Sequence, residues 1–152
     1  MLNFFIPRRY APSRAPFIGS ASAGIPLDPE SPFATQPHVP IPLGFRRHGM
    51  FVVQADGDSM TLPDGSGITH GSLVLVHGRD VLTERGHCYA FRLDDGTLVL
   101  KRLNLYQGRP ALHSDNPAYG PLLLDAGIRN LGRVYAYNVA GRGWVSSGYR
   151  GL

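Results

Sequence analysis

From Gly49 onward, the chain consists of short apolar or alternating runs separated by glycine-rich turns. Six runs have the length and composition of strands: residues 50–55, 73–77, 88–93, 98–103, 121–124 and 133–139. The segment Asp94-Asp95-Gly96 between two of these runs is a strong hairpin signal. No stretch of eleven or more residues has apolar positions at helical spacing. The pattern therefore predicts a mostly-β core.

Residues 1–44 differ in composition from the rest of the chain, because they hold nine of the 13 prolines. Proline removes a backbone donor and restricts φ, and this segment shows neither helical nor strand periodicity. We therefore expect a flexible proline-rich N-terminal arm over residues 1–48 and a β-rich domain over residues 49–152. The total length of 152 residues suits a single folded unit.

The composition excludes several classes of protein. A net charge of +4 with 17% charged residues is too small for general electrostatic binding of nucleic acid. One cysteine, Cys88, rules out an internal disulfide, and the six histidines show no metal-ligand spacing, so we expect no metal and no cofactor. No apolar run has the length of a membrane span, and the first residues do not resemble a signal peptide. These features predict a soluble, cytoplasmic protein.

Lys101 is the one lysine among 15 basic residues. In a strand over residues 98–103 it shares a face with Val99 and Leu103. Partial burial beside apolar neighbours lowers the pKa of an amine, which makes Lys101 a candidate general base near neutral pH. The alternative is an edge-strand lysine whose ammonium group reaches water.

Ser59 follows the 50–55 strand in the turn Gly57-Asp58-Ser59-Met60. A serine that leaves a strand through a glycine turn can present its hydroxyl together with local amides. The backbone N–H groups of Asp58 and Ser59 are therefore a candidate oxyanion hole, although an ordinary structural turn would have the same residue types. Together with Lys101, Ser59 suggests a Ser-Lys dyad for acyl transfer.

Four blocks, in this order along the chain, resemble the LexA/UmuD family of self-cleaving Ser-Lys peptidases. They are FVVQADGDSM (51–60), GSLVLV (71–76), LVLKRL (98–103) and LHSDNPAYGP (112–121). The resemblance implies a twisted β-sheet core like the LexA C-terminal domain, with Ser59 as nucleophile and Lys101 as general base. Relatives usually have a threonine two residues before this lysine, whereas this chain has Val99.

Members of this family cleave their own chain at an Ala-Gly or Cys-Gly bond in the arm. The arm contains a single Ala-Gly bond, Ala23–Gly24, with Gly24 lying 35 residues before Ser59. Small residues let the backbone approach a nucleophile closely. The resemblance thus implies cleavage that leaves residues 24–152, although an ordinary linker would also contain such a dipeptide.

The proline-rich arm cannot form the DNA-binding helix-turn-helix of LexA and phage repressors. The resemblance is therefore to the UmuD-like branch and implies a homodimer whose cleavage is stimulated by a RecA–single-stranded DNA filament during the SOS response. The processed form would be an accessory subunit of a Y-family translesion DNA polymerase, with no sequence-specific DNA binding and no membrane contact. Two alternatives are a non-enzymatic β-rich module of a DNA-repair complex with a degenerate dyad, and a signal-peptidase-like enzyme that cleaves other chains.

Overall fold

The computed structural model describes residues 11–21 and 37–148, so the bond Ala23–Gly24 lies outside the described residues. The described residues contain the following elements, in chain order: β1 (Arg14–Ala21), β2 (His38–Pro40), the 3-10 helix η3 (Leu43–Phe45), β3 (Met50–Ala55), β4 (Leu73–His77), β5 (Cys88–Arg92), β6 (Leu98–Tyr106), β7 (Arg109–His113), β8 (Leu122–Leu123), β9 (Arg129–Val139) and β10 (Gly143–Ser146). Among these elements there is no helix that could span a membrane.

The mostly-β prediction is confirmed, and each of the six predicted runs contains or overlaps a strand. β3 and β4 have the predicted bounds, whereas β6 and β9 are longer and β8 is shorter than expected. The predicted hairpin at Asp94-Asp95-Gly96 joins β5 to β6, and Gly96 has a φ of 89°, which a turn glycine adopts readily.

Four strands were missed, and two of them lie in the proline-rich segment that had shown no strand pattern. β1 pairs antiparallel with β2 over three residue pairs and parallel with β3. Pro16 and Pro40 lie in these strands. Proline has no backbone N–H to donate, but because β1 and β2 pair over only three residues, few hydrogen bonds are lost. The arm is therefore partly built into the sheet, because a distant strand supplies the partner that local periodicity does not reveal.

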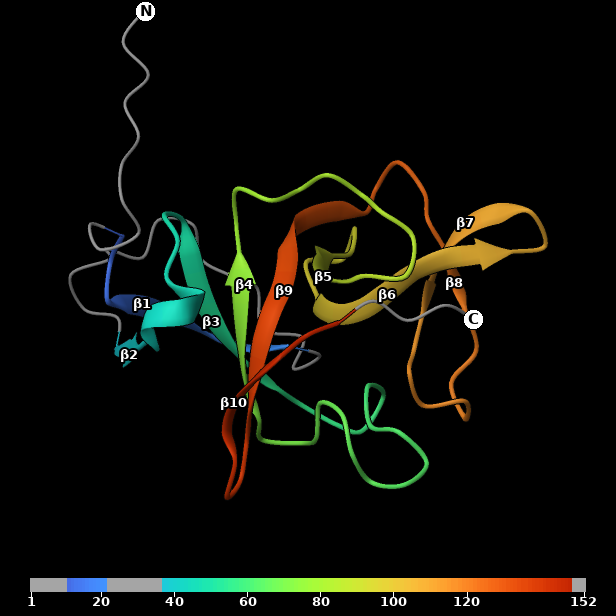
Figure 1. Ribbon diagram of the computed structural model, residues 1–152. Helices are drawn as coiled ribbons and strands as arrows, with labels where there is room; N and C mark the ends of the chain where they lie inside the picture. The colour runs from blue at the N-terminus through green and yellow to red at the C-terminus, as the bar shows by residue number, and fades with distance from the viewer. Residues whose placement is uncertain (1–10, 22–36, 149–152) are drawn as a thin grey trace, which may run out of the picture.

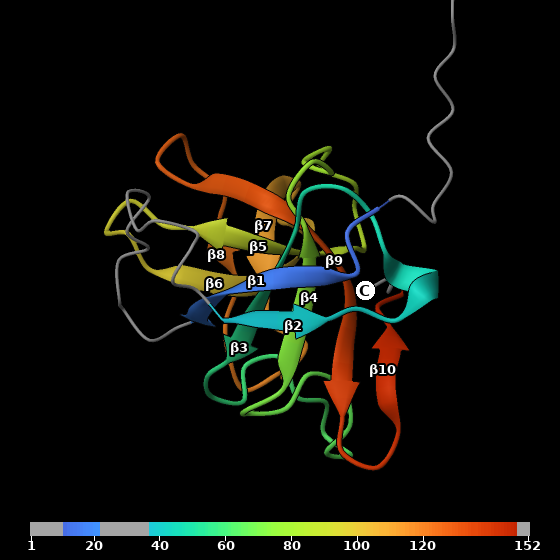
Figure 2. The ribbon, with the colours of Figure 1, turned by 90° about the vertical axis from the view of Figure 1, so that its left-hand side faces the viewer.

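The strands form one mixed sheet with β9 at its centre. The order is β2-β1-β3-β4-β9-β5-β6-β7-β8, with β10 paired to β9, and the β1–β3 pair is the parallel one. Figure 1 shows β4 and β9 side by side in the middle of the molecule, with β6 and β7 extending to one side. Figure 2 shows β1 and β2 together on the side that faces the viewer.

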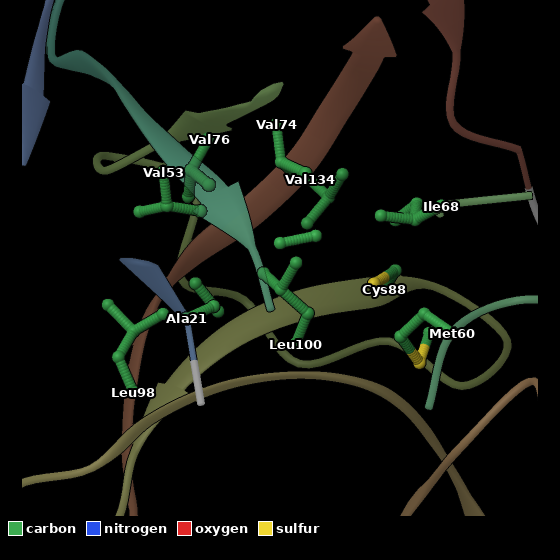
Figure 3. Packing of buried hydrophobic residues seen from close by; sticks show 12 residues of the cluster. Ala21, Val53, Met60, Ile68, Val74, Val76, Cys88, Leu98, Leu100 and Val134 are labelled. Atoms are coloured by element: carbon green, nitrogen blue, oxygen red, sulfur yellow. The ribbon is translucent and has the colours of Figure 1, made fainter. Parts of the chain in front are cut away.

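The largest buried cluster joins the end of the arm to the centre of the sheet. Ala21 at the end of β1 packs in this cluster with Met60, which follows the turn after β3, and with Leu100 of β6 (Figure 3). Burial of apolar surface contributes about 25 cal/mol per Å². The core therefore anchors the end of β1, the Ser59 turn and the Lys101 strand to one another.

Gly132 allows β9 to pass close to the backbone of β4. Its φ is 146°, and a Cβ at this position would lie 2.3 Å from the carbonyl oxygen of His77. The registers of the β4–β9 and β5–β9 pairs both shift near this residue. A β-bulge of this kind bends the strand, which lets β9 pair with β4 at one end and with β5 at the other.

We expect Gly132→Ala to lower the free energy of unfolding by more than about 2 kcal/mol, because backbone must move to relieve the clash. Gly141→Ala is the matched control: Gly141 also has a positive φ of 79°, but no atom of the described residues lies within 4 Å of the place that an alanine Cβ would occupy. This control should cost about 1 kcal/mol. Urea unfolding measures both variants, and equal losses would contradict the role assigned to the close approach at His77.

Candidate active site

The Ser59 turn is held at both ends. Gly57 has a φ of 82°, and its backbone N–H donates to Nδ1 of His70 at 2.9 Å. The turn closes through a hydrogen bond from the Thr61 N–H to the Asp58 carbonyl at 3.0 Å. Met60 is buried in the core while Ser59 remains partly exposed. The fold thus presents the Ser59 side chain at the surface of a well-anchored turn.

Lys101 lies on β6 and is half-buried. Its pKa is lowered from the usual lysine value because burial disfavours the ammonium form. The neighbouring Cys88 thiol offers no countercharge near neutrality, since burial raises its pKa to about 12. The carboxylate of Asp115 is engaged by Arg102 through two hydrogen bonds of 2.8 Å each. Among the residues that the structure describes, no carboxylate forms an ion pair with the amine, which favours a neutral base.

The structure brings Ser59 and Lys101 to one pocket. This pocket has a volume of about 280 Å³ and is lined by Asp56, Gly57, Asp58, Ser59, Lys101 and Tyr119. Within the described part of the chain, no hydrogen bond joins Ser59 to Lys101. The two predicted catalytic side chains therefore share a cavity that also contains the predicted oxyanion-hole residue Asp58.

The loop between β7 and β8 holds the backbone of the Ser59 turn. Asn116 donates from its side chain to the Asp58 carbonyl at 3.2 Å and from its backbone to the Ser59 carbonyl at 3.0 Å. The Tyr119 hydroxyl donates to the carboxylate of Asp58. Because a peptide group is planar, a fixed Asp58 carbonyl also fixes the direction of the Ser59 N–H. This geometry suits an amide that must point in a constant direction toward a reacting group.

A small apolar hollow adjoins Ser59 and includes the end of the arm. Ala21, Ala55, Met60, Ile68 and Leu100 line it together with Ser59. Ala21 is aligned with Ala55 in the β1–β3 register, and its carbonyl accepts a hydrogen bond from the Asp56 N–H at 3.1 Å. The described segment of residues 11–21 therefore ends beside Ser59, two residues before Ala23.

Sequence reasoning did not assign a role to Ser114, which contacts the Lys101 amine directly. The Nζ atom donates to the Ser114 Oγ atom at 2.7 Å and lies 5.8 Å from the centre of the Tyr119 ring. The β6–β7 hairpin turns at Gln107-Gly108 and pairs Arg102 with His113. One further step in this register brings Lys101 opposite Ser114, so recognition of that hairpin would have indicated the contact.

Comparison with known proteins identifies the family to which the chain belongs. The sequence profile of the family described as Peptidase S24-like matches residues 16–135. The chain belongs to the Peptidase S24-like family. It is also 30% identical over 115 residues to the LexA repressor of Proteus mirabilis (strain HI4320), an alignment that covers 75% of this chain and 53% of that protein. The chain thus spans about half the length of this curated relative. Both Ser59 and Lys101 lie within the segment that matches the S24 family, which supports a serine peptidase of the LexA/UmuD type.

We expect Lys101→Met to raise the free energy of unfolding at pH 7 by about 1 kcal/mol, because methionine removes a charge that burial disfavours. The lowered pKa means that the unfolded chain binds more protons between the folded and the ordinary lysine pKa. The native chain should therefore become more stable as pH rises through that window, and the advantage of methionine should shrink toward pH 10. Urea unfolding at both pH values, in chains that also carry Ser59→Ala, measures the difference.

The control for this prediction is Arg85→Met, which removes an exposed cation. It should change the free energy of unfolding by less than about 0.5 kcal/mol at either pH. A Lys101→Met chain that is less stable than its parent by the same amount at both pH values would show that the ammonium form is well accommodated.

Proposed function

We propose that this protein is a self-cleaving serine peptidase of the UmuD-like branch. Ser59 is the nucleophile, Lys101 is the general base, the backbone N–H groups of Asp58 and Ser59 form the oxyanion hole, and Ala23–Gly24 is the scissile bond. The observation that carries the proposal is the shared pocket of Ser59 and Lys101, in which the pKa of the amine is lowered by burial.

The reaction follows from the properties of these groups. The neutral Lys101 amine takes the proton of the Ser59 hydroxyl while Oγ forms a bond to the carbonyl carbon of Ala23. The two backbone amides stabilise the negative oxygen that results. The C–N bond to Gly24 then breaks, and the Lys101 ammonium group returns its proton to the departing amine. Water, deprotonated by Lys101, then attacks the ester carbonyl carbon. As the bond to Ser59 Oγ breaks, the Lys101 ammonium group returns a proton to Oγ, which leaves a free Ser59 hydroxyl and a carboxyl group on Ala23.

The path of the arm supports Ala23–Gly24 as the substrate. β1 runs beside β3, and its last residue, Ala21, lines the apolar hollow next to Ser59. Two extended residues span at most about 7 Å, so the Ala23 carbonyl is within reach of this pocket. The arm thus has a route to the nucleophile within its own chain.

The further properties in this proposal follow from the resemblance to the UmuD-like branch and from the family match. The protein forms a homodimer in the cytoplasm, and a RecA–single-stranded DNA filament stimulates cleavage after DNA damage. The processed form, residues 24–152, acts as an accessory subunit of a Y-family translesion DNA polymerase.

Self-cleavage of the purified chain is expected to increase with pH, because neutral Lys101 is the active form. Intact-mass spectrometry at a series of pH values from 7 to 10 should detect a fragment that begins at Gly24. Its rate of formation should level off below the ordinary lysine pKa of about 10.4, since burial lowers the pKa of Lys101. Both Ser59→Ala and Lys101→Arg should slow cleavage by more than about 100-fold.

Ser66→Ala is the matched control for the nucleophile, because Ser66 is an exposed serine in a nearby turn whose hydroxyl bonds to Asp64. This variant should cleave at the native rate. Cleavage that continues in the Ser59→Ala chain would refute the proposed nucleophile. A chain that stays intact at pH 10, with and without a RecA filament, would refute self-cleavage and favour a binding module.

A further inference from the structure

The loop of residues 114–119 contacts both the proposed base and the proposed nucleophile turn. Ser114 accepts a hydrogen bond from the Lys101 amine, and the centre of the Tyr119 ring lies 5.8 Å from this amine. Asn116 and Tyr119 hold the backbone and the carboxylate of Asp58. In Figure 1, this loop between β7 and β8 and the loop after β3 lie at the same lower end of the molecule. One loop therefore sets the position of both partners.

We propose that Ser114 is a positioning residue, whose hydroxyl holds the Lys101 amine so that the nitrogen lone pair faces the Ser59 pocket. A neutral amine has two N–H groups and one lone pair. When Ser114 accepts one N–H, rotation about the terminal C–N bond is restricted and the lone pair is directed away from Ser114. This inference rests on the proposed function, because it concerns the same base.

The surroundings of Lys101 explain why this contact matters. Val99, which shares a face of β6 with Lys101, is buried and has no hydroxyl to offer. Asp115 is bound to Arg102, whose guanidinium group also donates to the carbonyls of Gly86 and Gly148. Among the described residues, the Ser114 hydroxyl is thus the hydrogen-bond acceptor that orients the amine.

The test compares Ser114→Ala with Ser114→Thr and with the double variant Ser114→Ala/Val99→Thr. Loss of the hydroxyl should slow self-cleavage by about 10-fold or more at the pH plateau. It should also move the midpoint of the pH–rate profile to lower pH, since the hydrogen bond favours the ammonium form. Ser114→Thr keeps the hydroxyl and should keep most of the rate. In the double variant, the Val99→Thr substitution supplies a hydroxyl from the same face of β6 and should recover part of the loss.

Because the chain has one lysine, amine labelling reports Lys101 without any need for cleavage. In a Ser59→Ala background, the pH of half-maximal labelling by an acylating reagent should fall when Ser114→Ala is added, and Ser114→Thr should restore it. Labelling of the α-amino group of the chain is measured separately, on the N-terminal peptide. An unfolding curve confirms that each variant is folded.

Each outcome decides for or against the positioning role. Unchanged rate and unchanged labelling midpoint in Ser114→Ala would overturn it. A reduced rate with an unmoved midpoint would indicate a merely structural contribution and would overturn it as well. Cleavage that persists in Ser59→Ala but stops in Ser114→Ala would instead make Ser114 the nucleophile. If the native chain does not cleave, the labelling midpoint still tests the contact, so failure of the proposed function is recognised separately.

A second inference comes from the position of β1 inside the sheet. β1 lies between β2 and β3 in the strand order, and Ala15 and Ala21 are almost fully buried. Phe17 packs against the buried cluster that contains Ile41 and Val52. Cleavage after Ala23 cuts the chain beyond the end of β1 and removes none of these contacts. We infer that the fragment 1–23 remains bound as β1 in a non-covalent complex with residues 24–152.

Native mass spectrometry after cleavage tests this inference. The expected result is the summed mass of both fragments under native conditions and two separate masses under denaturing conditions. Ala15→Asp, which buries a charge in β1 far along the strand from Ser59, should release the fragment. Detection of residues 24–152 without the fragment, in the native chain, would overturn the inference.

A chain that does not depend on self-cleavage provides the same test. Ser59→Ala, combined with a recognition sequence for a site-specific protease in place of residues 27–33, can be cut by that protease in the same part of the arm. Retention of β1 should again appear as a single native mass. This second experiment separates failure of the inference from failure of the proposed function.

Discussion

The partly buried amine of Lys101 is the feature on which the rest of the site depends. A buried cation is normally stabilised by a carboxylate, but here Asp115 is held by Arg102 through two hydrogen bonds. The Arg102–Asp115 pair neutralises the arginine, and within the described part of the chain no carboxylate forms an ion pair with Lys101. Burial therefore disfavours the ammonium form and lowers the pKa of the Lys101 amine from its usual value.

The loop of residues 114–119 links the chemistry of the base to the geometry of the nucleophile. Its contacts with Lys101 and with the Asp58 and Ser59 carbonyls come from side chains and backbone within six residues. A displacement of this loop would therefore alter the base and the nucleophile turn together. Two proposed catalytic groups, one in the turn after β3 and one on β6, are thus positioned by the same loop, which suits a reaction that requires placement within a fraction of an ångström.

The arm has two roles that follow from one hydrogen-bonding pattern. As β1, it completes the sheet between β2 and β3 and fills part of the core with Ala15 and Ala21. As the segment before Ala23–Gly24, it leads the chain toward the Ser59 pocket. Parallel pairing with β3 aligns these roles, because β3 itself runs into the Ser59 turn. Under the proposed function, packing of the arm and presentation of the proposed scissile bond are thus coupled.

Local sequence patterns determined most of the β-sheet and pointed to Ser59 and Lys101. Alternation of apolar residues and the position of turn glycines depend on only a few neighbouring residues. Such local patterns predicted β3, β4, the β5–β6 hairpin and the residues that share a face of β6 with Lys101. Pairings between distant segments were not, since β1 is a strand by virtue of β3, more than 30 residues away. The contact between Lys101 and Ser114 likewise required the β6–β7 register, which depends on the turn at Gln107-Gly108. The residue types and their spacing thus pointed to the proposed reacting groups. Only the tertiary structure decided what surrounds these groups, because burial and hydrogen bonding arise from segments that the chain brings together on folding.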